Sequence, residues 1–206
     1  MKKKLKSYLV FTGFWYRILM FAIMPIALLA LQILSGFPAI VMFLIMIEIV
    51  ADNWFLGGIQ EKGAEKIDCL KTSCKGMEIM RSALVFDLIR RLLAATGIFG
   101  FSYLAGRFLG AEGNHWETCL LSIVISFTLS VAGTLISRFE SYLWVNMVTA
   151  YLAAVIGLIF ILLSENEAFA PWKGILGIAF VILGICVSIL AVKVAMKKVK
   201  GGYYDK

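Results

Sequence analysis

The sequence predicts an all-α integral membrane protein with six transmembrane helices. Its 206 residues are 61% hydrophobic and only 16% charged, whereas an average soluble domain is about 45–50% apolar and about 25% charged. Several uncharged apolar runs are about 20 residues long, which is the length that crosses a bilayer as a helix. Basic residues gather in alternate loops, as they do in oriented membrane proteins. These observations exclude a disordered chain and a soluble globular domain.

The expected spans form a single transmembrane domain covering 1–206. Three apolar runs contain no charged residue. A fourth contains Pro25, and neighbouring helices can satisfy a backbone group that a proline frees. Two further runs carry charged residues toward one end. In chain order the six spans are 18–34, 39–56, 84–109, 118–137, 142–163 and 174–192, with short outer loops at 35–38, 110–117 and 164–171.

The N-terminal segment combines lysines with an aromatic helical face. Four lysines precede the first apolar run, as in a signal peptide, but this run is longer and further spans follow, so we interpret it as an uncleaved first span. Tyr8, Phe11 and Trp15 would share one side of a helix. This favours a helix lying in the membrane plane on anionic lipid headgroups. The alternative is a flexible basic tail that only sets orientation.

The net charge of +7 would suggest nucleic-acid binding in a soluble protein. With the N-terminus inside, however, 18 of the 20 basic residues face the cytoplasm, and only Arg107 and Lys173 lie outside. We therefore expect a multi-pass protein of the cell membrane with both termini cytoplasmic and no nucleic-acid partner. All five tryptophans fall at predicted span ends, which is typical of the interfacial aromatic belt.

The loop 57–83 is the only sizeable soluble feature, and it lies on the cytoplasmic side. Its apolar residues recur at helical spacing between charged ones, and Gly63 and Gly76 interrupt the pattern. An exposed apolar stripe suits a groove on a partner protein, although it could instead pack against this protein's own helix ends. The candidate docking residues are Glu65, Lys66, Ile67, Asp68, Leu70, Lys71, Lys75 and Met77.

The loop offers no nucleotide or metal site of its own. The Gly58-x-x-x-x-Gly63 pattern begins like a phosphate-binding loop but lacks the Lys-Ser/Thr that must follow. Cys69 and Cys74 have no histidine nearby, and the lone His115 is expected across the membrane. We therefore expect no cofactor on this chain and no enzymatic activity.

Five charged residues are expected within the membrane. Glu48 and Asp52 are four residues apart and share a helix face, while Asp87 precedes Arg90 and Arg91 at the spacing of helical ion pairs. A charge at mid-bilayer costs about 2.5–3.5 kcal/mol on insertion scales, so the two spans should pair their charges in one cluster at the cytoplasmic mouth. Such a cluster could be a structural staple or have a gating or coupling role.

Small residues mark expected close contacts between helices. Thr118, Ser122, Ser126, Ser130 and Thr134 follow one another every four residues in the fourth span. This polar seam suits close helix packing, or it could line a weakly polar path. Further close-packing positions are Gly106-x-x-x-Gly110, Ala153-x-x-x-Gly157, and Gly177 with Gly184.

The layout resembles the membrane subunit of ABC-2-type exporters. The stretches Leu70-Lys71-Thr72-Ser73-Cys74-Lys75-Gly76 and Asp87-Leu88-Ile89-Arg90-Arg91 are similar to short bacterial permeases of the kind that exports phenol-soluble modulin peptides. The resemblance implies a coupling helix within 63–75, seated on an ABC ATPase subunit that binds ATP and Mg. It also implies a second permease copy, identical or related, and export of an amphipathic peptide or other hydrophobic substrate.

Two other functions remain open. An ion-coupled secondary transporter could use Glu48 and Asp52, but this class is expected to show internal repeats and interrupted helices. A non-transporting membrane scaffold would need neither internal repeats nor interrupted helices.

Overall fold

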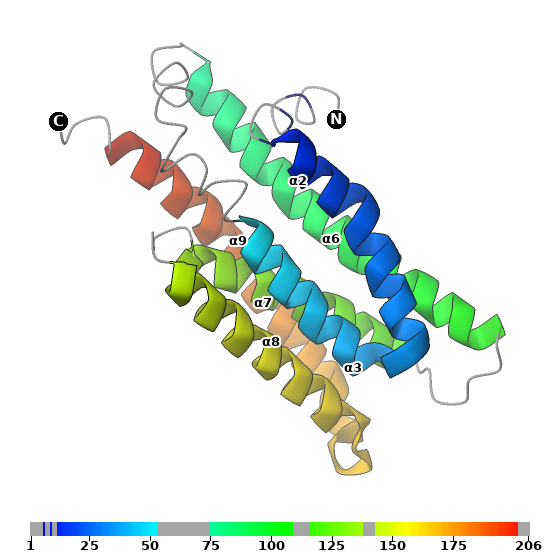
Figure 1. Cartoon of the computed structure of the whole chain (residues 1–206). Helices are drawn as coiled ribbons and strands as arrows, with labels where there is room; N and C mark the ends of the chain where they lie inside the picture. Colours follow the sequence, from blue (N-terminus) through cyan, green and yellow to red (C-terminus); the bar gives the residue numbers. More distant parts are fainter. Residues whose placement is uncertain are drawn as a thin grey trace.

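The computed structural model describes residues 6, 9, 12–52, 75–108, 116–137 and 143–201. Within them every regular element is helical, which confirms the all-α prediction. The long helices run along a common axis (Figure 1). The elements are α2 (Phe14–Ile18), the π-helix η1 (Leu19–Ile23), α3 (Met24–Asp52), α6 (Gly76–Phe108), α7 (Trp116–Ser137), α8 (Leu143–Glu165), the 3-10 helix η3 (Glu167–Trp172) and α9 (Lys173–Gly201).

Three helices are long and apolar enough to cross a membrane. They are Trp116–Ile136, Trp144–Glu165 and Lys173–Lys197, and they coincide with the expected spans 118–137, 142–163 and 174–192. Among the described residues the other three expected spans are not both long enough and apolar enough to cross a membrane. The full set of six spans is therefore not confirmed. α6 differs from the three because charged residues lie along its length.

The first expected span begins with a widened helical turn. The backbone N–H of Met24 donates to the carbonyl of Leu19, five residues earlier, which defines η1. Pro25 follows directly; it has no N–H, and its ring would clash with the carbonyl four residues before it. A π-turn next to a proline relieves this conflict without ending the helix.

The chain reverses direction within α3, although its backbone stays helical from Met24 to Asp52. The loop expected at 35–38 is thus helical, with Pro38 inside it. Tyr16 and Glu48 both lie beside Arg90, yet a straight helix would hold them about 48 Å apart. Figure 1 shows the blue N-terminal part and the cyan part of α3 running in opposite directions.

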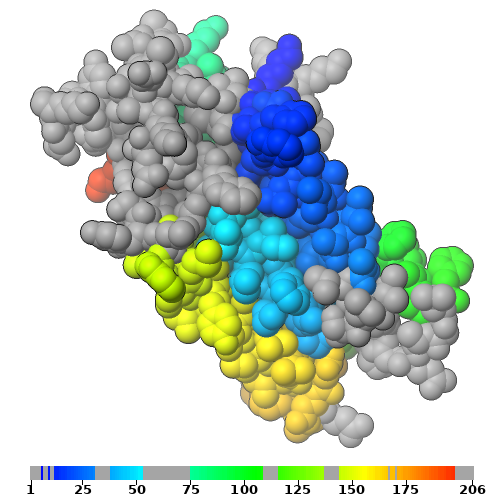
Figure 2. Space-filling view, viewed as in Figure 1, coloured from blue at the N-terminus to red at the C-terminus, as the bar shows by residue number. Residues whose placement is uncertain are grey.

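α7 is the centre of the bundle and contacts α3, α6, α8 and α9. Its candidate span is 61% buried, against 17% for that of α9. α3 also packs along α8, as Figure 2 shows on one face of the molecule.

Glycines allow some of these close approaches but not all that were expected. A Cβ on Gly157 would lie 2.6 Å from Ile45, and one on Gly184 would lie 2.7 Å from the hydroxyl of Thr128. Gly133 likewise faces the side chain of Ile49. The expectation for Gly177 is not met within the described chain, because nothing from a neighbouring helix lies within 4 Å of the position that a Cβ would occupy there.

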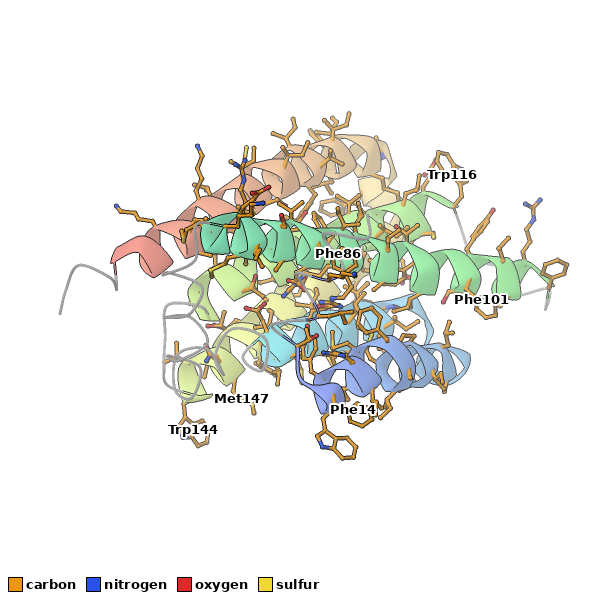
Figure 3. The ribbon with its side chains drawn as sticks, turned by 90° about the horizontal axis from the view of Figure 1, so that it is seen from above. Phe14, Phe86, Phe101, Trp116, Trp144 and Met147 are labelled. Atoms are coloured by element: carbon orange, nitrogen blue, oxygen red, sulfur yellow. The ribbon has the colours of Figure 1, made fainter. Side chains whose placement is uncertain are left out.

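Charge and tryptophan mark the two ends of the bundle. The starts of α2 and α6 and the end of α9 lie at one end, whereas the end of α6 and the start of α9 lie at the other (Figure 1). Arg107 and Lys173 are thereby separated from the exposed lysines and arginine near the start of α6 and the end of α9. The four described tryptophans are all exposed at or near element ends, and Trp116 and Trp144 lie at opposite ends (Figure 3).

Candidate functional site

Five ionisable residues meet in the interior where α3 faces α6. We call Glu48, Asp52, Asp87, Arg90 and Arg91 the ion cluster. The two acids of α3 lie in its last two turns, and the other three lie midway along α6. Every member is at most 5% exposed. Charges this deeply buried are stable only with partners and good hydrogen-bond geometry.

Arg90 makes the principal link between the two helices. Its Nη1 donates to Oε1 of Glu48 at 2.9 Å, and its Nη2 donates to the other Glu48 oxygen. The same guanidinium donates from Nε and Nη2 to Oδ1 of Asp87, at 3.2 and 3.1 Å. A two-pronged arginine–carboxylate pair is both strong and directional.

Arg91 extends the network to a third helix. Its Nη2 donates to Oδ1 of Asp52 at 2.7 Å and its Nε to Oδ2 of Asp87 at 3.0 Å. Its Nη1 donates to the backbone carbonyl of Ser130 in α7 at 3.4 Å. Asp87 therefore bridges both arginines, one with each oxygen.

The cluster also reaches the hairpin that α2, η1 and α3 form, which we call the N-terminal hairpin. Tyr16 of α2 is buried and interacts electrostatically with Arg90. The Nε of Arg91 lies 3.7 Å from the carboxylate of Glu48, so the two arginines share that acid as well. The arrangement joins α2, α3, α6 and α7 through charge rather than through apolar packing alone.

The polar seam of α7 faces the interior. Ser122, Ser126, Ser130 and Thr134 are all buried. Three of these hydroxyls donate to carbonyls of their own helix: Ser122 to Thr118 at 2.7 Å, Ser130 to Phe127 at 2.9 Å and Thr134 to Val131 at 2.8 Å. The Ser126 hydroxyl has no hydrogen-bond partner among the described residues. Small hydroxyl side chains that bond to carbonyls of their own helix have no need of water or a polar substrate, so they favour close helix packing over a polar path.

One hydroxyl contact off the seam was not anticipated. Thr128 of α7 donates from Oγ1 to the carbonyl of Phe180 in α9 at 3.1 Å. Thr128 does not belong to the four-residue series, so no pattern in the sequence singles it out.

Most of the expected docking loop lies outside the described residues. This applies to Glu65, Lys66, Ile67, Asp68, Leu70 and Lys71, and also to Cys69, Cys74 and His115. Lys75 is exposed immediately before α6, and Met77 is partly buried in its first turn. The last eight residues of the expected loop 57–83 therefore belong to α6, which begins at Gly76 and not at the expected residue 84.

Arg17 organises the entry to α2, which the sequence did not reveal. Its Nη2 donates to the carbonyls of Leu9 and Thr12 at 2.8 and 2.9 Å, and its Nε donates to the Thr12 hydroxyl at 3.1 Å. Gly13 adopts an extended conformation directly before α2. The expected aromatic face is only partly described: Trp15 is exposed, whereas Tyr8 and Phe11 lie outside the described residues.

The chemistry of the site is that of an electrostatic link between helices. Within the described ranges no group of three or more His, Cys, Asp or Glu residues could hold a metal ion. Instead, the acids of the ion cluster are bound by two guanidinium groups, which cannot be deprotonated in a protein. The sequence matches no protein-family model, and it has no significant similarity to a curated protein or to a solved structure.

Proposed function

We propose that this chain is the transmembrane permease subunit of an ATP-driven exporter. It would cross the cell membrane six times with both termini in the cytoplasm. The α2–α3 hairpin would supply the first two spans and α6 the third, followed by α7, α8 and α9. The alternating direction of these helices and the gathering of exposed basic residues at one end support this arrangement.

The observation that carries the proposal is the continuity of α6. This helix runs without interruption from Gly76 to Phe108. Its first residues follow the expected coupling segment 63–75, and Arg90 lies about 21 Å further along the same helix. A displacement imposed at the start of α6 would therefore reach the ion cluster through a single rigid element.

The ion cluster is suited to such a displacement because its partners are shared. Asp87 accepts hydrogen bonds from both arginines, and the Glu48 carboxylate lies within 3.7 Å of Arg91 while bonded to Arg90. A shift of α6 against α3 could exchange these partners without leaving a buried charge unpaired, which would cost several kcal/mol.

In the proposed cycle, ATP and Mg bind to a separate ABC ATPase subunit. Closure of two ATPase subunits moves the coupling segment, α6 shifts against α3, and a pair of permease subunits releases substrate outward. The largely apolar surfaces of α8 and α9 suit an amphipathic peptide or other hydrophobic substrate that reaches the protein from the lipid.

The secondary-transporter alternative is less well supported. It requires Glu48 or Asp52 to take up and release a proton or another ion. Both acids are hydrogen-bonded to arginines in the buried cluster, and a permanent cation opposes binding of a second one.

The proposal is tested by co-purification with an ATPase encoded beside this chain. Changing Leu70→Glu and Met77→Glu together should abolish association, because charged residues cannot fill an apolar groove. The matched control is Ala168→Glu, an exposed position at the opposite end of the bundle, which should leave association intact. Unchanged ATPase binding in the double variant would refute the coupling assignment.

A transport assay separates the two mechanisms. Export of a labelled amphipathic peptide from reconstituted vesicles should require ATP and the ATPase subunit. Transport that follows a proton gradient in the absence of ATP would instead establish the secondary transporter.

A further inference from the structure

The C-terminal helix continues beyond its apolar run as an amphipathic extension. The uncharged run 174–192 is about 29 Å long as a helix, which matches the hydrocarbon thickness of a bilayer. α9 nevertheless remains helical to Gly201. The extension is therefore an ordered part of the helix.

The extension contains four lysines, and three of them, all except Lys198, occupy positions on one side of it. Lys193 and Lys197 are four residues apart and both are exposed. Lys200 follows three residues later, at a position on the same helical face. We call these three positions the lysine ridge.

The other side of the extension is held by the bundle. Ala195 is 8% exposed, and Ala191, one turn earlier in the apolar run, is 1% exposed. Ala195 belongs to the same hydrophobic cluster as Met80 and Leu84 of α6, and α9 contacts α6. This packing fixes the direction in which the lysine ridge faces.

We infer that the ridge of Lys193, Lys197 and Lys200 binds anionic phospholipid headgroups of the cytoplasmic leaflet. Lys193 and Lys197 would lie within about 8 Å of the end of the hydrocarbon core, at the depth of the lipid phosphates. The inference rests on the membrane placement proposed above and does not require the ATPase partner.

Charge complementarity selects the lipid phosphate as the ligand. The lysines could instead serve only to orient the protein by the positive-inside rule. That role needs only basic residues in a loop, and it does not need three of them on one ordered helical face. On the neighbouring start of α6, the described charged groups are Lys75, Glu78 and Arg81, all exposed, and they leave this end of the bundle net positive.

The test uses the full-length protein in neutral detergent, titrated with phosphatidylglycerol or phosphatidylcholine and followed by native mass spectrometry. The variant is Lys193→Gln, Lys197→Gln and Lys200→Gln combined. The matched control is Arg107→Gln with Lys173→Gln, which removes the described basic residues of the opposite end. A variant with arginine at the three ridge positions keeps the charge.

Affinity for phosphatidylglycerol should fall about fivefold per lysine, or on the order of a hundredfold for the glutamine variant at low salt. The opposite-end control and the arginine variant should bind like the wild type, and high salt should abolish the difference. Equal phosphatidylglycerol affinity in the wild type and the glutamine variant would overturn the inference. So would lost ATPase association with unchanged lipid binding, because the ridge would then bind an acidic protein surface.

Discussion

Arg90 of α6 donates hydrogen bonds to both carboxylate oxygens of Glu48, a residue 42 positions earlier in α3. The two residues are too far apart in the sequence for helical spacing to bring them together, so the pair is a tertiary contact between α3 and α6. It holds the N-terminal hairpin against α6 at the level where Arg91 reaches α7.

The first prediction concerns this pair. Glu48→Leu should lower the free energy of unfolding by about 3–5 kcal/mol, because the Arg90 guanidinium loses its main counter-charge while still buried. Glu48→Leu with Arg90→Leu should lose less, since Asp87 keeps Arg91 as its partner. Unfolding in detergent micelles measures both. A double variant no more stable than the single one would show that the unpaired Arg90 charge is not the main cost of losing Glu48.

The second prediction concerns the contact between α7 and α3. A methyl group on Gly133 would lie 2.7 Å from Cγ1 of Ile49, so Gly133→Ala should cost about 1–3 kcal/mol by overpacking. In an Ile49→Ala background the same change should cost almost nothing further. Gly97→Ala is the control, because nothing lies within 4 Å of that position. Thermal unfolding of these variants beside the wild type checks the coupling.

The third prediction concerns the clamp at the entry to α2. Arg17→Gln removes a charged donor that holds the carbonyls of Leu9 and Thr12. Backbone amides at the start of α2 should exchange hydrogen faster, while amides in α7 should be unaffected. Hydrogen exchange followed by mass spectrometry measures both regions. Unchanged protection at the start of α2 in the variant would show that the clamp does not hold this segment in solution.

The fourth prediction concerns orientation. After the native cysteines are replaced by serine, a single cysteine at Lys75 should react with an impermeant thiol reagent only from the cytoplasmic side. A single cysteine at Ala168 should react only from the outside, because Lys75 and Ala168 belong to opposite ends of the bundle. Labelling of both positions from the same side would contradict the proposed topology.

Some of this fold was predictable because the bilayer imposes simple requirements. The helices α7, α8 and α9 follow from uncharged runs of spanning length, which need no tertiary information. The members of the ion cluster could also be selected from sequence. Helical spacing places Glu48 and Asp52 on one face and sets Asp87 beside Arg90, and burial in an apolar protein demands partners.

Other features depend on neighbours that no local pattern encodes. Gly157 and Gly177 are the same residue in comparable apolar helices, yet only Gly157 lies against another helix. The position of Arg17 in the sequence does not reveal that its guanidinium donates to the carbonyl of Leu9. At 35–38 the proline and glycine favour a loop, whereas the structure keeps a helical backbone while the chain reverses direction.

The ion cluster also constrains how the protein is made. Glu48 and Asp52 leave the ribosome before Arg90 and Arg91, so in the proposed topology the acids would enter the membrane region while their partners are still missing. α6 in turn brings two arginines that an isolated helix could not place in lipid without cost. In the proposed topology, insertion of α6 would therefore depend on the N-terminal hairpin, and the order of synthesis supplies the carboxylate acceptors before the guanidinium donors.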